Sequence, residues 1–98
     1  MIKRPGAERG QVAVTFEVDP AVGAERAYVC GDFNDWSQDT HAMARNGDGG
    51  FTLTVALDAG RSYRFRYYLD GERWENDWNA DSYVENEFGG ADSLLNLE

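Results

Sequence analysis

The sequence predicts an all-β fold: an antiparallel, immunoglobulin-like β-sandwich of about six to eight short strands. Hydrophobic residues alternate with polar ones at a period of two over several segments, as in strands that bury one face. Turn-forming Gly, Asn and Asp residues separate these segments at regular intervals. No segment shows the period or the capping residues of a helix. These observations favour the sandwich, with an up-and-down barrel as the alternative fold.

The N-terminal third contains two predicted strands. Residues 1–10 have no period and include one proline and two glycines, so we expect a flexible lead-in before a single domain spanning residues 11–98. From Gln11 to Asp19, four hydrophobic residues alternate with small or polar ones, which predicts a half-buried strand. Residues 20–23 turn the chain, and residues 26–30 predict a second short strand.

The middle of the chain predicts two hairpins. Residues 43–45 form a brief edge strand, and the turn signal of residues 46–50 joins it to the next strand. Residues 51–57 and 63–69 alternate clearly and predict two longer strands. The short turn over residues 58–60 predicts that these two strands pair with each other as a hairpin.

The C-terminal part predicts a third hairpin and the longest loop. Asp70-Gly71 has the composition of a type I′ turn, so residues 72–75 are expected to pair with the strand before it. A loop over residues 76–90 follows, rich in acidic residues, Asn and Gly. Residues 93–97 close the chain as a last short strand.

The charge balance narrows the classes of partner. Eighteen acidic residues against nine basic ones give a formal net charge of −9. This charge repels nucleic acids and anionic lipid surfaces, so we expect no nucleic-acid and no membrane partner. The single cysteine, Cys30, excludes an internal disulfide, and the first residues lack the apolar segment of a signal peptide. Both observations favour a cytoplasmic protein.

No catalytic or metal-binding motif stands out, so we expect neither an enzyme nor a cofactor. Carboxylates are too abundant for a pair of them to indicate a glycosidase. The acidic residues of the long loop are interpreted as solvated; they are Asp77, Asp81, Glu85 and Glu87. Residues 77–81 match the start of an EF-hand loop, but Ser82 and Phe88 stand where the required Gly and Glu belong. One Cys and one His cannot form a structural zinc site.

Three tryptophans, Trp36, Trp74 and Trp78, lie outside the clear alternating segments. Each indole either folds back over the end of the sandwich or offers a surface to a ligand. Three together favour binding, because a flat indole suits the C–H-rich face of a glucose ring while nearby polar groups bond to its hydroxyls. Arg64 and Arg66 share one face of their strand, where a guanidinium either bonds to sugar hydroxyls or forms a cross-strand ion pair.

A set of motifs in order carries a resemblance to a known family. The set consists of Gly31-Asp32-Phe33-Asn34-Asp35-Trp36, Gly60, the strand from Tyr63 to Leu69, Asp70-Gly71, Trp74, Asp77 and Asn86-x-Phe88-Gly89. Over about residues 11–97, the chain resembles the carbohydrate-binding module family 48. That family contains the glycogen-binding domain of the AMP-activated protein kinase beta subunit and the isoamylase-type N-terminal early-set domains of glycogen branching and starch debranching enzymes. The resemblance implies binding of α-1,4-linked glucan, such as glycogen, starch or maltooligosaccharide.

The resemblance also implies roles for individual side chains. Trp36 and Trp74 match the two sugar-stacking tryptophans of the kinase-type modules, and Arg66 matches a hydrogen-bonding lysine. Arginine keeps the donor function with a different geometry. Trp78 has no counterpart, and we expect it either to extend the stacking surface or to cover the core.

The family loop that clasps the glucan matches the segment from Phe88 to Asp92, and here the sequence departs from the family pattern. Phe88 replaces an aliphatic residue, and Asp92 stands where an asparagine binds sugar. A carboxylate accepts hydrogen bonds but cannot donate them as an amide does. Gly90 replaces a residue with a hydroxyl, so the sugar contacts of this loop are expected to be altered.

Two functions follow from these observations. The leading one is non-catalytic binding of α-glucan at a shallow surface site through aromatic stacking. The alternative is a protein-interaction domain that docks onto a glycogen-metabolising enzyme or a kinase-like complex without binding sugar itself. Exposed indoles favour the first function, because a module kept only for packing does not need them.

Overall fold

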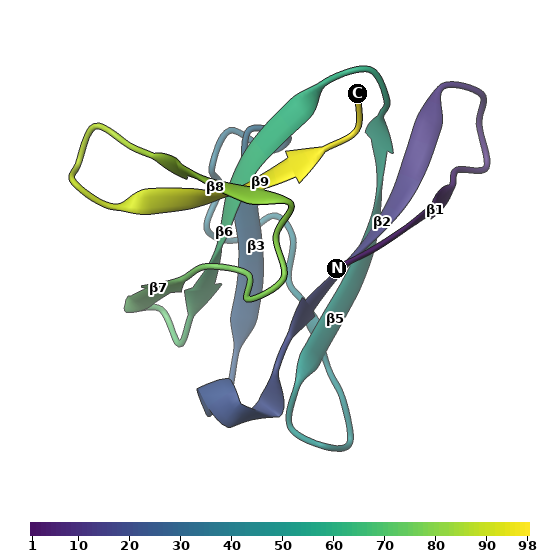
Figure 1. Cartoon of the computed structure of the whole chain (residues 1–98). Helices are drawn as coiled ribbons and strands as arrows, with labels where there is room; N and C mark the ends of the chain where they lie inside the picture. Colours follow the sequence, from purple (N-terminus) through teal and green to yellow (C-terminus); the bar gives the residue numbers. More distant parts are fainter.

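Two antiparallel sheets form the fold in the computed structural model, which describes residues 1–98. The elements, in chain order, are β1 (Ile2–Pro5), β2 (Gln11–Val18), the 3₁₀ turn η1 (Pro20–Val22), β3 (Ala27–Gly31), β4 (Ala44–Arg45), β5 (Phe51–Asp58), β6 (Ser62–Leu69), β7 (Arg73–Glu75), β8 (Ser82–Glu85) and β9 (Ala91–Asn96). One sheet has the order β1-β2-β5-β4, and the other has the order β3-β6-β9-β8 with β7 also paired to β6 (Figure 1). This arrangement confirms the predicted sandwich. The chain contains no helix with the length and apolarity that crossing a membrane requires.

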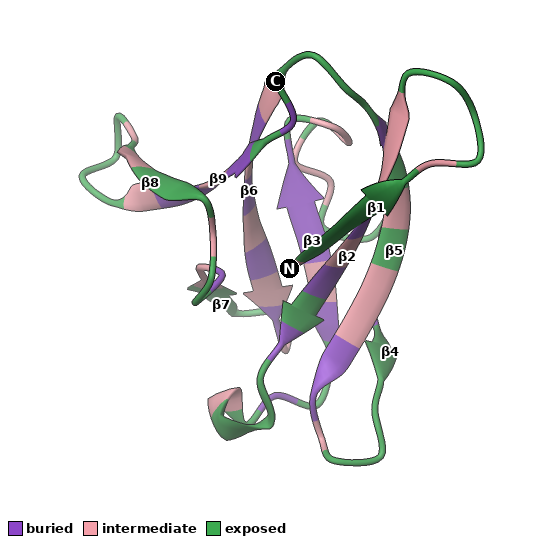
Figure 2. Ribbon diagram, turned by 45° about the vertical axis from the view of Figure 1, so that its right-hand side comes forward, coloured by how far each residue is buried: buried purple, intermediate pink, exposed green.

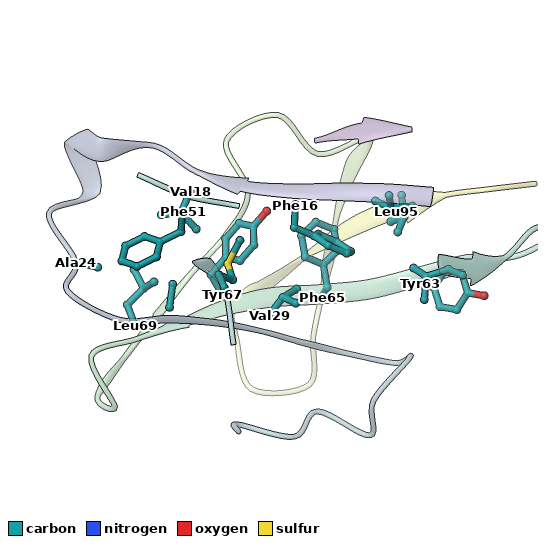
Figure 3. Close-up of a cluster of buried hydrophobic side chains, with 14 of the residues drawn as sticks. Phe16, Val18, Ala24, Val29, Phe51, Tyr63, Phe65, Tyr67, Leu69 and Leu95 are labelled. Atoms are coloured by element: carbon teal, nitrogen blue, oxygen red, sulfur yellow. The ribbon is translucent and has the colours of Figure 1, made fainter. Parts of the chain in front are cut away.

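The core lies between the two sheets and follows the predicted alternation. Along β6, buried and half-buried residues alternate without interruption, as the colours of that strand show in Figure 2. Phe16 of β2 and Phe65 of β6 meet from opposite sheets with ring centroids 5.0 Å apart (Figure 3). Complete burial of such side chains contributes about 1.5–3 kcal/mol each. The same alternation sends Arg64 and Arg66 to the outer face of the second sheet.

The predicted hairpin between residues 51–57 and 63–69 is wrong. β5 pairs with β2 and β4, whereas β6 pairs with β3, β7 and β9, so the chain crosses from one sheet to the other after Asp58. Tyr63 stabilises this corner, because its hydroxyl donates to the Asp58 carbonyl over 2.8 Å. Each strand buries one face, and both faces are covered when the strands lie opposite each other across the core.

Two strands form where the sequence predicted none. Residues 2–5 of the expected lead-in pair with β2 as the edge strand β1, and Lys3 forms an ion pair with Asp81 near the other sheet. Residues 82–85 of the expected long loop form β8, which pairs with β9. Neither strand has a consistently buried face, so neither carries the alternation that reveals a strand in a sequence.

The other two predicted hairpins are confirmed. β4 pairs with β5 across residues 46–50, and β6 pairs with β7 across Asp70-Gly71. Asp70 and Gly71 have φ values of 56° and 70°, as a type I′ turn requires. This turn places Trp74 directly opposite Tyr68 on β6.

Candidate functional site

A groove on the outer face of the second sheet gathers most of the predicted site. In Figure 1, β7 and the β8–β9 hairpin project from the same side of the sandwich. Side chains of both segments line the groove. Its volume is about 620 Å³, which is within the range of small-molecule sites. Its lining comes from four separate segments: Asp32, Trp36, Arg64, Arg66, Trp74, Asn86, Glu87, Phe88 and Asp92. Five of the six carbohydrate-binding residues expected from the sequence lie here, and Trp78 lies elsewhere.

Trp36 is held by a tight turn directly after β3. Asp35 and Trp36 both have left-handed backbone conformations, with φ values of 54° and 58°. Such a conformation costs a non-glycine residue of order 1–3 kcal/mol. The backbone N–H of Trp36 donates to the Gly31 carbonyl over 2.9 Å, and its indole Nε1–H donates to Asp32 Oδ1 over 3.2 Å. Asp32 Oδ2 accepts the backbone N–H of Arg64 over 2.8 Å, which fastens the turn to β6 and fixes the direction of the indole.

The first residues of the Gly31–Trp36 motif build this turn. A Cβ at Gly31 would lie only 2.4 Å from the Arg64 carbonyl oxygen, so no side chain fits there. Asn34 Oδ1 accepts the Gly31 N–H over 3.0 Å, and Asn34 Nδ2 donates to the Val29 carbonyl over 3.0 Å. The polar residues of the motif therefore shape the loop, and its last residue supplies the aromatic ring.

Trp74 completes an aromatic surface that continues from Trp36. The centroids of the two indoles lie 6.4 Å apart, and their planes are inclined by 60°. Tyr68 supports Trp74 from the neighbouring strand, with ring centroids 4.6 Å apart. Trp74 is 36% exposed and Trp36 is half-buried, so both rings keep surface for a ligand.

Arg64 and Arg66 form the floor of the groove on the outward face of β6. The Nε–H group of Arg66 is buried and has no hydrogen-bond partner. Arg64 Nη1 lies 3.9 Å from Asp92 Oδ2, which is the long limit of an ion pair. Neither guanidinium has its donors fully used within the chain, and such donors suit the hydroxyl oxygens of a sugar.

Asn86 organises the loop between β8 and β9. Its Oδ1 accepts the backbone N–H groups of Phe88 and Gly90 over 3.0 Å and 3.1 Å. Its Nδ2 donates to Asp92 Oδ1 over 3.2 Å. Phe88 stands at the tip and is 87% exposed, whereas Asp92 is buried at the base. The loop thus presents an aromatic ring, while the Asp92 carboxylate already has a partner.

Trp78 lines a different cavity and is 54% exposed. This cavity has a volume of about 200 Å³ and shares no lining residue with the groove. The structure therefore places Trp78 neither on the stacking surface of Trp36 and Trp74 nor in the core.

The interpretation of the acidic residues in the long loop as solvated is wrong for Asp77, which is only 3% exposed. One Asp77 oxygen accepts the hydroxyl of Tyr67, and the other accepts the Asn79 N–H over 2.7 Å. The Asp77 backbone N–H donates to Ser93 Oγ over 2.9 Å. Burial, followed by the negative charge and hydrogen bond of Asp77, raises the pKa of Tyr67 well above its usual range. Asp77 is therefore an anchor for the segment that carries Trp78.

The sequence expectation did not place three of the lining residues among the binding side chains. They are Asp32, Asn86 and Glu87. Arg64, named beside Arg66 as a candidate sugar donor, also lines the groove, and Asp32 and Asn86 belong to the quoted motifs. Their hydrogen bonds depend on partners distant in sequence or on loop geometry, so no local pattern reveals them.

Comparison with known proteins gives one clear relationship. A search of curated protein sequences finds no match. Residues 6–84 match the sequence model of carbohydrate-binding module 48, described as the isoamylase N-terminal domain. The matched range includes all three tryptophans and Arg66 and ends before Phe88 and Asp92. This family consists of non-catalytic carbohydrate-binding modules with an immunoglobulin-like fold. The chain belongs to the carbohydrate-binding module 48 family.

Proposed function

We propose that this domain binds α-1,4-linked glucan, such as glycogen, starch or a maltooligosaccharide, and catalyses no reaction. The observation that carries the proposal is the inclination of Trp36 and Trp74 by 60° at a centroid distance of 6.4 Å. Successive rings of an α-1,4-linked chain turn relative to each other because the chain is helical. Two inclined indoles therefore match two successive glucose faces, whereas a flat β-1,4-linked ribbon needs coplanar rings.

The polar lining of the groove also fits a neutral ligand. Two guanidinium groups, Arg64 and Arg66, face three carboxylates, Asp32, Asp92 and Glu87, so the charges nearly cancel. Polyanions are not attracted by such a lining, whereas sugar hydroxyls both donate and accept hydrogen bonds. Arg66 stands at the position that the family resemblance gives to a hydrogen-bonding lysine, and its guanidinium also donates hydrogen bonds.

Several features of the groove support binding without catalysis. Both oxygens of Asp32 accept hydrogen bonds from the protein, and Asp92 is held by Asn86. Glu87 is exposed. A glycosidase needs two carboxyl groups facing each other across the scissile bond, one of them able to donate a proton. The groove offers no such free pair.

The affinity for a short glucan is expected to be weak. Two partly exposed rings on an open surface give a dissociation constant of order micromolar to millimolar, which is about 4–8 kcal/mol. Glycogen displays many chains and raises the apparent affinity through avidity.

A titration with maltoheptaose tests the proposal, recorded by NMR on the indole N–H groups. The Trp36 and Trp74 signals should shift saturably, and cellohexaose should leave them much less changed. Trp36→Ala should reduce co-sedimentation with glycogen at least tenfold. Ile2→Ala, which truncates an exposed hydrophobic residue that does not line the groove, is the matched control. If neither indole responds to maltoheptaose, the glucan proposal fails and docking onto a protein partner becomes the better explanation of the exposed rings.

A further inference from the structure

Asp77 and Trp78 reverse the usual pattern of burial, in which charged side chains are exposed and large aromatic side chains are buried. The carboxylate of Asp77 is buried at 3% exposure, while the indole of the next residue is 54% exposed. A charged group is rarely buried, and a large aromatic group gains free energy by burial. The buried contacts of Asp77 with Tyr67 and Ser93 hold the backbone in place, and this placement keeps Trp78 outside. The structure therefore keeps a large indole exposed directly beside a buried, hydrogen-bonded carboxylate.

The cavity beside Trp78 is lined by residues of both sheets. Its walls come from the end of β2, the β4–β5 hairpin and the segment after β7, and the indole forms part of the rim. Because side chains alternate along β7, Trp74 faces the glucan groove while Glu75 lines this second cavity. The two sites therefore lie on different faces of the domain.

The lining of this cavity is rich in hydrogen-bond acceptors. The carboxylates come from both sheets and their connections: Glu17, Asp19, Asp48, Glu75 and Asp77. The only cationic group in the lining is the α-amino group of Met1, and it already pairs with Glu17 over 3.2 Å. The side chains of Glu75 and Asn79 form no hydrogen bond within the chain, so they remain open to a ligand. Such a lining repels anions and suits a ligand that offers several O–H donors beside an apolar face.

The volume of the cavity limits the size of the ligand. About 200 Å³ is below the range of roughly 300–1,000 Å³ for sites that take drug-sized molecules. One sugar ring is a ligand of suitable size, with its C–H face on the Trp78 indole and its hydroxyls toward Glu75 and Asn79.

We propose that the Trp78 cavity is a second carbohydrate site, independent of the groove, which takes a single neutral sugar ring. The identification of that ring as a glucose unit rests on the proposed function. With two sites on different faces, one domain bridges two chains or two branches of the same polysaccharide. The second contact then occurs at a high effective concentration and raises retention on glycogen above that of the groove alone.

The experiment compares methyl α-glucoside with maltoheptaose on the separate indole N–H signals of the whole chain. The midpoint is the sugar concentration at which an indole signal reaches half of its full shift. If the Trp78 site takes one ring, its midpoint should differ less than about threefold between the two sugars. The Trp36 and Trp74 midpoints should fall at least tenfold with maltoheptaose, because the groove contacts successive rings. No Trp78 shift at saturation of the groove, or a Trp78 midpoint that falls in parallel with those of the groove, overturns the second site.

Variants separate this inference from the proposed function. The double variant Trp36→Ala, Trp74→Ala should lose the groove response and keep the Trp78 response. Trp78→Ala should keep the groove response for maltoheptaose and lose at least threefold in glycogen retention, and Trp78→Phe should recover part of it. Shifts at Trp78 alone in the native chain would overturn the proposed groove but not the second site. Shifts at Trp36 and Trp74 alone would overturn the second site but not the proposed groove.

The acceptor-rich lining requires one further comparison, because a basic side chain of a partner protein also suits carboxylates beside an indole. N-acetylarginine amide is the probe for that ligand class, and we expect it to leave Trp78 nearly unchanged at moderate salt. A saturable Trp78 shift with this probe and none with methyl α-glucoside would overturn the sugar site in favour of a site for basic side chains.

Discussion

The side-chain amide of Asn86 donates a hydrogen bond to Asp92 Oδ1 over 3.2 Å and so couples the tip of the β8–β9 hairpin to the base of the groove. The same amide accepts from the backbone N–H groups of Phe88 and Gly90. Asp92 thus serves to hold Asn86 in place, and Asn86 determines where Phe88 points. The Asp92 carboxylate therefore helps to fix the conformation of the loop that carries Phe88.

Asn86→Ala should weaken both the hairpin and the groove. It removes three hydrogen bonds, each with a net contribution of about 0.5–1.5 kcal/mol, and exposure places the sum at the low end, near 1.5–2 kcal/mol. The affinity for maltoheptaose should fall severalfold because Phe88 loses its fixed position. Urea unfolding and an NMR titration measure the two effects. Glu87→Gln, in the same loop, serves as the control, and unchanged affinity in Asn86→Ala would show that the loop does not contact the glucan.

Gly90→Ser should strengthen glucan binding. A Cβ at Gly90 would lie 3.6 Å from Asn86 Nδ2, an ordinary contact, and the backbone there does not need glycine. The added hydroxyl restores the group that the family resemblance implies at this position. We expect a two- to fivefold gain in affinity for maltoheptaose, which corresponds to about 0.4–1 kcal/mol. Gly90→Ala is the matched variant without the hydroxyl, and an equal gain in both variants would contradict a hydrogen bond from the serine.

Tyr67→Phe should destabilise the domain by about 1–3 kcal/mol. The variant deletes the hydroxyl that donates to buried Asp77 and accepts the Glu17 N–H over 3.2 Å, so a buried carboxylate loses a partner. The free energy of unfolding in urea measures the loss. Combining it with Asp77→Asn in a double-mutant cycle should give a coupling of at least about 0.5 kcal/mol. Additive effects would mean that the two side chains stabilise the fold independently.

Asp70→Asn should make the domain less sensitive to acid. The backbone N–H groups of Arg26 and Glu25 donate to Asp70 Oδ1 over 2.9 Å and 2.8 Å and lower the pKa of its carboxyl group. A lowered native pKa gives stability that is present above the unfolded value of about 3.9 and is lost as the pH falls through the native value. Asparagine keeps the acceptor and tolerates the positive φ of this turn.

The measurement for Asp70 is urea unfolding of both proteins across acidic pH. The wild-type free energy of unfolding should exceed that of Asp70→Asn at neutral pH, and this difference should shrink as the pH falls below about 4. Asp48→Asn is the control, because Asp48 is an exposed turn residue whose carboxylate accepts one backbone N–H, that of Gly50, over 2.9 Å. A constant difference across the range would show that the Asp70 hydrogen bonds do not depend on its charge.

Much of the sandwich was predictable, because strands with one buried face show an alternation of hydrophobic and polar residues in the sequence. β2 and β6 are the clearest cases, since their inward residues form the core. The partner of each strand was not predictable in the same way. A short turn between two alternating strands is compatible with a hairpin inside one sheet and with a crossing between two sheets, and only the corner at Asp58 and Tyr63 distinguishes them.

Most residues of the candidate groove could be predicted from the sequence motifs, whereas the cavity beside Trp78 could not. Trp36 and Trp74 meet because the tight turn after β3 and the type I′ hairpin after β6 bring them to one face. The hairpin was predicted from Asp70-Gly71, whereas the left-handed turn became known only from the structure. The exposure of Trp78 depends on the burial of Asp77 against Tyr67 and Ser93. A carboxylate in an acidic loop gives no local indication that it is buried, so that placement required the tertiary structure.

The two left-handed residues of the turn after β3, Asp35 and Trp36, set the stability of the fold and the placement of the Trp36 ring in opposition. Asp35→Gly relieves a strained φ and would make the domain more stable, of order 1 kcal/mol, because glycine adopts that conformation freely. The same freedom lets the Trp36 ring turn away from its place beside Trp74. Selection for thermal stability alone would therefore favour glycine at position 35. A more stable variant that must also bind sugar would keep Asp35 and gain its stabilising substitutions at other positions.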